Sequence, residues 1–214
     1  MVNQTTQNTS ETGKGNKTGK GFKTTTIAKI SILASAAAVL MLFEIPLFFA
    51  PGFYKLDFSE VAVLLGAFSM GPAAGIVIEA VKILVNFVID GSVTAGVGEL
   101  ANFLIGCSFV VPATVIYKRN KTRKNAILGL AAGTAVMVVF SAFMNLYVLL
   151  PVYAKAFNMP IDAIVEMGTK VNSAITDIHA FILFATVPFN VVKGAASSLI
   201  TVLIYKKLSP LLHR

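Results

Sequence analysis

Long apolar segments separated by short polar ones limit most strongly what this chain can fold into. Apolar residues dominate six runs along the sequence: 27–49, 58–70, 73–89, 99–117, 126–150 and 178–205. A helix needs about 20 such residues to cross the hydrocarbon core of a bilayer. The second run is much shorter, because Gly71 and Pro72 separate it from the third. The pattern predicts an all-α integral membrane protein with six transmembrane helices, the fifth of them ending before Pro151.

The overall composition agrees with a lipid environment. Apolar residues make up 56% of the 214, charged residues make up 13%, and the mean hydropathy is +0.77. In a soluble domain about a quarter of the residues are charged. A chain this poor in charge could not cover its surface in water, so we predict a multi-pass protein of the cell membrane.

Residues 1–26 have a different composition. This stretch is rich in Thr, Gly, Asn and Lys and has almost no apolar residues, so it cannot bury enough surface to fold. The segment Gly13–Gly21 contains glycines and lysines, but its spacing does not fit a phosphate-binding loop and no strand precedes it. We therefore predict a disordered basic cytoplasmic tail over 1–26 and a six-helix membrane domain over 27–214.

The distribution of basic residues predicts the orientation. Six crossings place both termini on the same side of the membrane. Thirteen of the 18 Lys and Arg residues fall on that side, five of them between Lys118 and Lys124. Because cytoplasmic loops carry an excess of Lys and Arg, both termini are predicted to be cytoplasmic. The net charge of +8 then reflects membrane topology, and nucleic-acid binding is not needed to explain it.

Residues suited to catalysis or metal binding are sparse. Cys107 is the single cysteine, and the two histidines, His179 and His213, lie too far apart to suggest a metal site. Asp177 and His179 lie two residues apart and therefore face different sides of a helix, so we interpret them as caps. The sequence predicts neither an enzyme nor a metalloprotein.

Polar residues inside the apolar runs are the candidate functional residues, because an ionisable group is costly at the centre of a bilayer. Glu79 and Lys82 lie three residues apart and can neutralise each other, so they are either functional or a structural ion pair. Asn86 lies on the same helical face. The other polar residues are Asp57, Glu60, Glu99, Asn102, Asn145, Asn190 and Lys193. The first two of these lie where the first external loop enters the second run.

In the predicted topology these residues, Asn86 included, gather in the external half of the bundle. Polar contacts between helices could explain any one of them. A whole set at one depth instead favours a pocket open to the outside. Amides, one cation and abundant aromatic residues, with 16 Phe and 5 Tyr, suit a flat and largely apolar molecule with a polar edge.

Four short motifs, taken in order, resemble one transporter family. They are YKLDFSEV at 54–61, GPAAG at 71–75, GELANF at 98–103 and PFNVVKG at 188–194. With the number of apolar runs and the basic loop, they resemble the riboflavin-specific substrate-binding (S) components of energy-coupling factor (ECF) transporters, the RibU family, over residues 27–207. Ala62 departs from the pattern, where a proline is expected, and this affects how the second helix begins.

The resemblance implies an S component that binds riboflavin with high affinity from outside the cell, as transported substrate and not as cofactor. A transmembrane coupling protein and two ATPase subunits would supply the energy, so the lack of a Walker motif is expected. The first external loop, 50–57, corresponds to a lid. An Asn amide can both donate to and accept from the uracil-like edge of the flavin, whereas a Lys can donate. The predicted substrate-binding residues are Asn190 and Lys193, then Asn145, and with them Asn102, Glu99 and Asp57.

A pair of small residues is the predicted partner interface. Ala34 and Ala38 lie four residues apart in the first run, a spacing that lets two helices approach closely in lipid. The resemblance favours the coupling protein as the partner, and packing inside this same bundle is the alternative. Two other functions stay open: an S component for a different vitamin, and a stand-alone secondary transporter with Glu79 and Lys82 as a proton relay.

Overall fold

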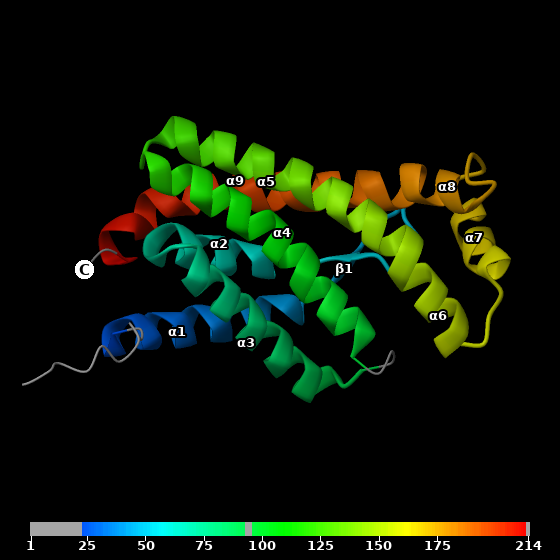
Figure 1. Cartoon of the computed structure of the whole chain (residues 1–214), viewed down its shortest axis with the longest axis horizontal. Helices are drawn as coiled ribbons and strands as arrows, with labels where there is room; N and C mark the ends of the chain where they lie inside the picture. The colour runs from blue at the N-terminus through cyan, green and yellow to red at the C-terminus, as the bar shows by residue number, and fades with distance from the viewer. Residues whose placement is uncertain (1–22, 93–95, 213–214) are drawn as a thin grey trace, which may run out of the picture.

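The computed structural model describes residues 23–92 and 96–212, which form an elongated bundle of helices (Figure 1). Most of the predicted tail, with the segment Gly13–Gly21, lies outside the described residues, as does His213. The first helix begins at Thr24, three residues before the expected boundary at 27.

Helices make up nearly all of the regular structure, with one small hairpin between the first two. Their bounds, in chain order, are α1 (Thr24–Met41), β1 (Ile45–Pro46), β2 (Lys55–Leu56), α2 (Ser59–Met70), α3 (Pro72–Asp90), α4 (Val97–Arg119), α5 (Arg123–Met144), η1 (Asn145–Leu149), α6 (Leu150–Ala156), α7 (Ile161–Thr169), α8 (Ile178–Phe181), η2 (Ile182–Thr186) and α9 (Val187–Leu212). The labels η1 and η2 denote π-helical turns inside longer helical segments.

Within residues 23–92 and 96–212, five helical segments are long and apolar enough to cross a membrane. They are Thr24–Met41, Pro72–Asp90, Val97–Arg119, Arg123–Ala156 and Ile178–Tyr205. Large apolar side chains cover their outward faces, and exposed examples are Ile32, Val88, Val139, Leu199 and Leu203. An apolar outer surface suits lipid and not water, and the fold is that of an all-α membrane protein.

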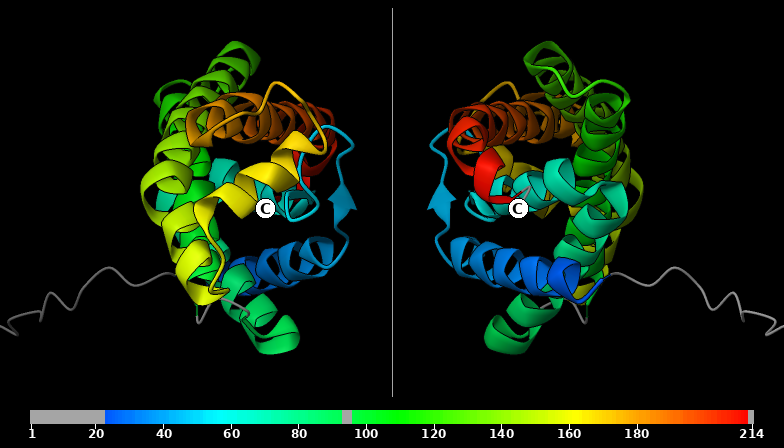
Figure 2. Two further views of the ribbon diagram at one scale, coloured as in Figure 1. Left: turned by 90° about the vertical axis from the view of Figure 1, so that its right-hand side faces the viewer. Right: turned by 90° about the vertical axis from the view of Figure 1, so that its left-hand side faces the viewer.

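The second apolar run forms α2, a helix of 12 residues. At 1.5 Å per residue it is about 18 Å long, well short of the roughly 30 Å hydrocarbon core. Nearly every residue of α2 is buried, because α1, α3, α4 and α9 all pack against it. The views along the long axis show α2 inside the ring of longer helices (Figure 2). The short helix is therefore an inner element of the bundle.

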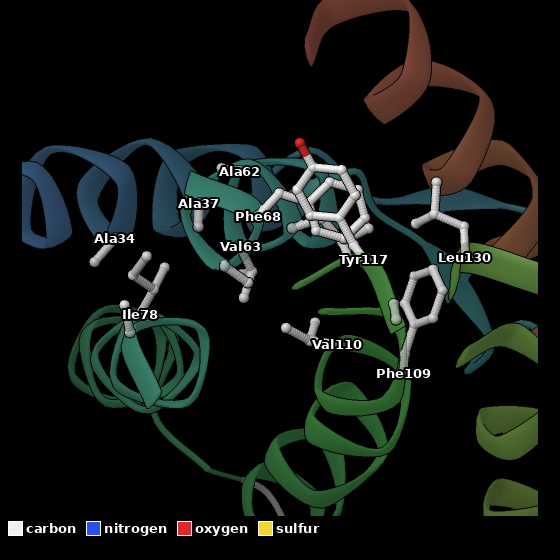
Figure 3. Close-up of a cluster of buried hydrophobic side chains, with 14 of the residues drawn as sticks. Ala34, Ala37, Ala62, Val63, Phe68, Ile78, Phe109, Val110, Tyr117 and Leu130 are labelled. Carbon is white, nitrogen blue, oxygen red and sulfur yellow. The ribbon is translucent and has the colours of Figure 1, made fainter. Parts of the chain in front are cut away.

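The first helix joins the core through its alanines. Ala34 lies beside Ile78 of α3, and Ala37 lies beside Val63 of α2 (Figure 3). Ala34 and Ala38 are 0% and 3% exposed. Small side chains on this face let α1 approach α2 and α3 closely. The predicted partner interface at Ala34 and Ala38 is thus corrected: both pack inside the bundle, which was the alternative.

The fourth and fifth helices pack closely through glycines. A Cβ atom at Gly129 would lie 2.4 Å from the carbonyl oxygen of Ala113, and one at Gly133 would lie 2.4 Å from that of Phe109. Both distances are shorter than any non-bonded contact allows, so any larger residue would force α4 and α5 apart. Glycines four residues apart are a common device for helix contact in membranes.

Pro151 and Pro188 lie inside continuous helical segments, each just after a π-helical turn. Pro151 follows η1 and Pro188 follows η2. A proline lacks an N–H and its ring clashes with the carbonyl four residues earlier. The backbone N–H of Leu150 bonds to Asn145 and that of Val187 to Ile182, five residues back, and this wider turn accommodates the proline. The helix therefore continues to Ala156 and does not end before Pro151 as predicted.

The two ends of the bundle differ in their contents. One end holds the start of α1, the α2–α3 and α4–α5 turns and the end of α9, and the other holds the hairpin, the start of α4, and α6 to α8 (Figure 1). Lys118, Arg119, Lys121, Arg123 and Lys124 lie at the first end, at the α4–α5 turn. We call these the basic end and the hairpin end.

Candidate ligand-binding site

A cavity of about 200 Å³ lies toward the hairpin end of the bundle. Its wall combines parts of α1, the hairpin loop, α4, η1, α6 and α9. The lining residues are Met41, Glu44, Phe53, Tyr54, Lys55, Asp57, Gly98, Ala101, Asn102, Ile105, Asn145, Leu149, Tyr153, Phe189, Asn190 and Lys193. Five of the six predicted substrate-binding residues are in this set, from four separate parts of the chain.

The loop between α1 and α2 lines one side of this cavity. α1 ends at Met41, not near Phe49 as predicted, because Pro46 and its neighbours form an antiparallel hairpin in which Ile45 pairs with Leu56. Lys55 Nζ lies 2.5 Å from Glu44 Oε2 across the hairpin. The loop of the hairpin places Phe53, Tyr54, Lys55 and Asp57 in the cavity wall.

Asn190 and Lys193 lie side by side on α9, three residues apart. The Nδ2 of Asn190 donates to the carbonyl of Thr186 at 2.9 Å, which leaves its Oδ1 without a partner among the described residues. Lys193 Nζ donates to Asp57 Oδ2 at 3.0 Å and keeps two further protons. This wall therefore offers one acceptor and one charged donor next to each other.

Tyr54 ties the loop to both π-helical turns. Its hydroxyl donates to Asn145 Oδ1, the first residue of η1, at 2.8 Å, and lies 2.7 Å from Thr186 Oγ1, the last residue of η2. Burial raises the pKa of Tyr54 well above its ordinary value, so the hydroxyl keeps its proton. The ring lies 4.9 Å from that of Phe189. Asn145 also donates to Ser141, so both ends of its amide are held in place.

The structure does not bring every predicted polar residue to the cavity. Glu99 lies in the first turn of α4, accepts a hydrogen bond from Ser92 at 2.9 Å, and lines a neighbouring apolar cavity instead of the polar one. Asn86 donates to Asp90 at 2.9 Å on the exposed side of α3. The sequence shows which residues share a helical face, but not which helix packs against that face. In the structure, α4 packs against a different side of α3 from the one that carries Asn86.

An apolar cavity of about 490 Å³ adjoins the polar one, and the two share Phe53, Gly98 and Tyr153. Glu99, Phe157 and Met159 of the loop between α6 and α7, and Ile164 and Met167 of α7 complete its wall. A ligand with a polar edge and an apolar body could place the first against α9 and the second against these side chains.

A separate group of charged side chains joins α2 and α3. Lys82 Nζ is 2.7 Å from Glu79 Oε1 and 3.0 Å from Glu60 Oε1, and all three side chains are at most 1% exposed. The predicted Glu79–Lys82 pair is therefore present, and Glu60 joins it although its position in the sequence suggested the cavity entrance. We call these three residues the buried triad.

Sequence reasoning missed the aromatic residues that line the cavity. Phe53 and Tyr54 were visible as neighbouring aromatic residues beside Asp57, and Phe189 lies in the PFNVVKG motif, but Tyr153 lies in a helix full of apolar residues and carries no distinguishing signal. Asp177 is a cap as predicted: its Oδ1 accepts from the backbone of Ala180 and His179, which lowers its pKa. Within 23–92 and 96–212, no group of three or more His, Cys, Asp and Glu is placed to hold a metal ion.

The sequence profile of one family, described as "ECF transporter, substrate-specific component", matches residues 25–205. The chain belongs to this family. It is therefore a component of a membrane transport system, as predicted, and not an enzyme.

Individual relatives agree with this assignment. The chain is 37% identical over 185 residues to a protein of Staphylococcus aureus named "Riboflavin transporter RibU", which covers 86% of this chain and 90% of that one. It is 34% identical over 182 residues to "Riboflavin transporter FmnP" of Bacillus subtilis, with 85% and 90% covered. A solved structure described as "Structure and mechanism of the S component of a bacterial ECF transporter" superposes with a TM-score of 0.69 at 34% identity, covering 89% and 98%.

Proposed function

We propose that this chain is the riboflavin-binding S component of an ECF importer and that it captures the vitamin from the extracellular side. The relatives named as riboflavin transporters support this substrate, since they span almost the whole chain. The observation that carries the proposal is the wall of α9, where the free Oδ1 of Asn190 lies beside the ammonium of Lys193.

This pair complements one edge of the flavin. The uracil-like edge of the isoalloxazine presents an N–H donor between two carbonyl acceptors. The Oδ1 of Asn190 would accept from that N–H, and Lys193 would donate to the adjacent carbonyl. The aromatic rings of Tyr54 and Phe189 would contact the flat face of the ring system. Asn102 and Asn145 line the remaining polar wall.

The proposed orientation has six membrane segments, α2 included, with both termini in the cytoplasm. The basic end would then face the cytoplasm, because Lys and Arg are enriched in cytoplasmic loops. The cavity, at the opposite end, would open toward the outside. This arrangement supports capture of a vitamin before any energy is supplied.

Energy for uptake would come from a transmembrane coupling protein and two ATPase subunits. Since Ala34 and Ala38 are buried, the face of α1 available to that partner is the outward one, where Ser31, Ser35 and Ala36 are exposed. Ser31 bonds to its own backbone at Ile27, 3.0 Å away, so its hydroxyl needs no partner in the lipid. Ser31 and Ser35 lie four residues apart, the spacing that allows close helix contact.

Riboflavin itself provides the test, because it is yellow and fluorescent. Protein purified in mild detergent should carry flavin absorbance, and ligand-free protein should quench the fluorescence of added riboflavin at near-stoichiometric amounts. Thiamine and biotin should not compete. A colourless protein that leaves the fluorescence unchanged would contradict the proposal, and competition by another vitamin would point to a different S component.

A further inference from the structure

The buried triad has no part in the transport role proposed above. Glu60 of α2 and Glu79 and Lys82 of α3 are among the most buried side chains of the bundle. Both carboxyl groups face the single ammonium of Lys82, at 3.0 Å and 2.7 Å. With every group ionised, the triad would carry one uncompensated negative charge in an apolar surrounding.

The outer oxygens of the two carboxyl groups lack partners. Glu60 Oε2 and Glu79 Oε2 are fully buried and have no hydrogen-bond partner among the described residues. A buried carboxylate is strongly disfavoured unless hydrogen bonds and a counter-charge compensate it. Two carboxylates that share one site likewise cannot both ionise easily, because each raises the cost of charging the other.

Among the described residues, the further cation near Glu79 is Lys193, whose charge is already paired. Lys193 of α9 is engaged by Asp57, which also accepts from the backbone of Ser59. On the α4 side, Gly106 lies against the two carboxyl groups: a Cβ atom there would lie 2.4 Å from Glu79 Oε1 and 3.1 Å from Glu60 Oε1. The adjacent titratable group on α4 is the thiol of Cys107. Of the described residues around Glu79, those that carry or can carry charge are Glu60, Lys82, Cys107, Asp57 and Lys193.

We propose that the triad is a proton-binding site and that Glu79 holds the proton at neutral pH. Glu60 lies in the first turn of α2, where the helix N-terminus stabilises a negative charge, and it accepts a hydrogen bond from Lys82. Glu79 lies in the middle of α3, away from any helix N-terminus, and its Oε1, although 2.7 Å from Lys82 Nζ, makes no hydrogen bond of good geometry among the described residues. The triad is then a Glu60–Lys82 ion pair beside a neutral carboxylic acid, and its net charge is zero.

Infrared spectroscopy of the detergent-purified protein at neutral pH tests the assignment directly. A protonated carboxyl group has a carbonyl band that a carboxylate lacks. We expect this band in the wild-type protein, its loss in Glu79→Gln, and its retention in Glu166→Gln, an exposed control paired with Lys170. Absence of the band from the wild-type protein, or its persistence in Glu79→Gln, would overturn the proposal.

Thermal unfolding gives a second readout. Because the folded state would bind one proton that the unfolded state releases, wild-type stability should fall as pH rises above about 5, by up to about tenfold in the unfolding equilibrium constant per pH unit. Glu79→Gln should show a flatter profile and an unchanged melting temperature at pH 7. A wild-type profile as flat as that of Glu79→Gln would contradict the proposal, as would stabilisation by sodium without a carboxyl band.

Discussion

Lys193 is held by an internal partner before any ligand arrives, and this shapes what its replacement should do. Lys193→Met removes the donor to the flavin but also leaves Asp57 buried without its cation. A hydrogen bond from a charged donor contributes about 1.5–3 kcal/mol, so riboflavin affinity should fall roughly 10- to 100-fold. Titration by fluorescence quenching measures the change.

A second variant separates the two effects of this substitution. Lys193→Met with Asp57→Asn removes the stranded charge while the donor is still missing. We expect the double variant to bind riboflavin as weakly as Lys193→Met alone. Recovery of wild-type affinity in the double variant would mean that Lys193 acts on Asp57 and does not contact the ligand.

Asn190 is predicted to contribute less, because its hydrogen bond is neutral. Asn190→Leu removes the free Oδ1 from the cavity wall and should weaken riboflavin binding by about 2- to 10-fold, from about 0.5–1.5 kcal/mol. Asn86→Leu is the matched control, since Asn86 lies outside the cavity and should leave affinity unchanged. Equal losses in both variants would point to a general effect on folding.

Tyr54 should control how long the ligand stays. Tyr54→Phe keeps the aromatic ring and removes the hydroxyl that joins the loop to Asn145 and Thr186. Loss of this neutral hydrogen-bonded link should speed riboflavin dissociation by roughly 2- to 10-fold, because the loop would open more often. Stopped-flow fluorescence after addition of excess unlabelled competitor measures the rate. An unchanged rate would show that the loop is held by other contacts.

The polar residues of the cavity could be found from the sequence, whereas their partners could not. An asparagine or lysine in an apolar run is conspicuous because lipid disfavours it, and Asn102, Asn145, Asn190 and Lys193 all line the cavity. The pairing of Lys193 with Asp57 joins residues 136 positions apart, and no local pattern encodes it. Glu99 shows the limit of the argument: depth in the membrane is readable, but the direction a side chain faces is not.

At the scale of the helix, the two faces of α1 should respond differently to bulk. Ala34→Leu inserts a large side chain between α1 and α3, where Ala34 contacts Ile78, and should lower both the melting temperature and riboflavin binding. Ser35→Leu lies on the exposed face and should leave binding intact while it impairs uptake by the assembled importer. Melting curves and binding titrations in detergent, with vitamin uptake by cells that express the complete importer, distinguish the two.

The variants Ala34→Leu and Ser35→Leu together test the proposed coupling face and the orientation of α1. If Ser35→Leu supports normal uptake, the partner contacts another surface. If Ala34→Leu retains full stability and binding, the packing of α1 against α3 is not as tight as the structure indicates.

Helix positions followed from the sequence more closely than helix ends. The apolar runs gave all of the long segments, because composition alone determines which stretches suit lipid. Two ends were misplaced: the first was placed near Phe49 because the apolar run continues past Pro46, and the fifth was placed before Pro151 because proline was taken as a helix breaker. At Pro46 the chain leaves α1 earlier than expected to form the hairpin, and at Pro151 the π-helical turn allows the helix to continue. Both outcomes depend on contacts with other elements.

At the scale of the whole molecule, binding and energised transport should be separable. The purified chain in proteoliposomes should bind riboflavin but not accumulate it against a gradient, with or without an imposed proton gradient. The buried triad supports this expectation, because its carboxyl groups are closed off from both ends of the bundle and have no exposed oxygen. Measurement of radiolabelled riboflavin uptake provides the test. Sustained uphill uptake driven by protons would instead favour a stand-alone secondary transporter.

The number of residues in each of the two π-helical turns, 145–149 and 182–186, is also constrained. Removing one residue from 145–149 would convert the wide turn to an ordinary one and rotate everything after it by about 100° around the helix axis. Tyr153 would then leave the cavity wall. The same loss in 182–186 would turn Asn190 and Lys193 away together. Side chains in both segments can be exchanged, but the number of residues cannot change without altering the binding site, and single-residue gaps should be tolerated in loops outside the cavity walls and not here.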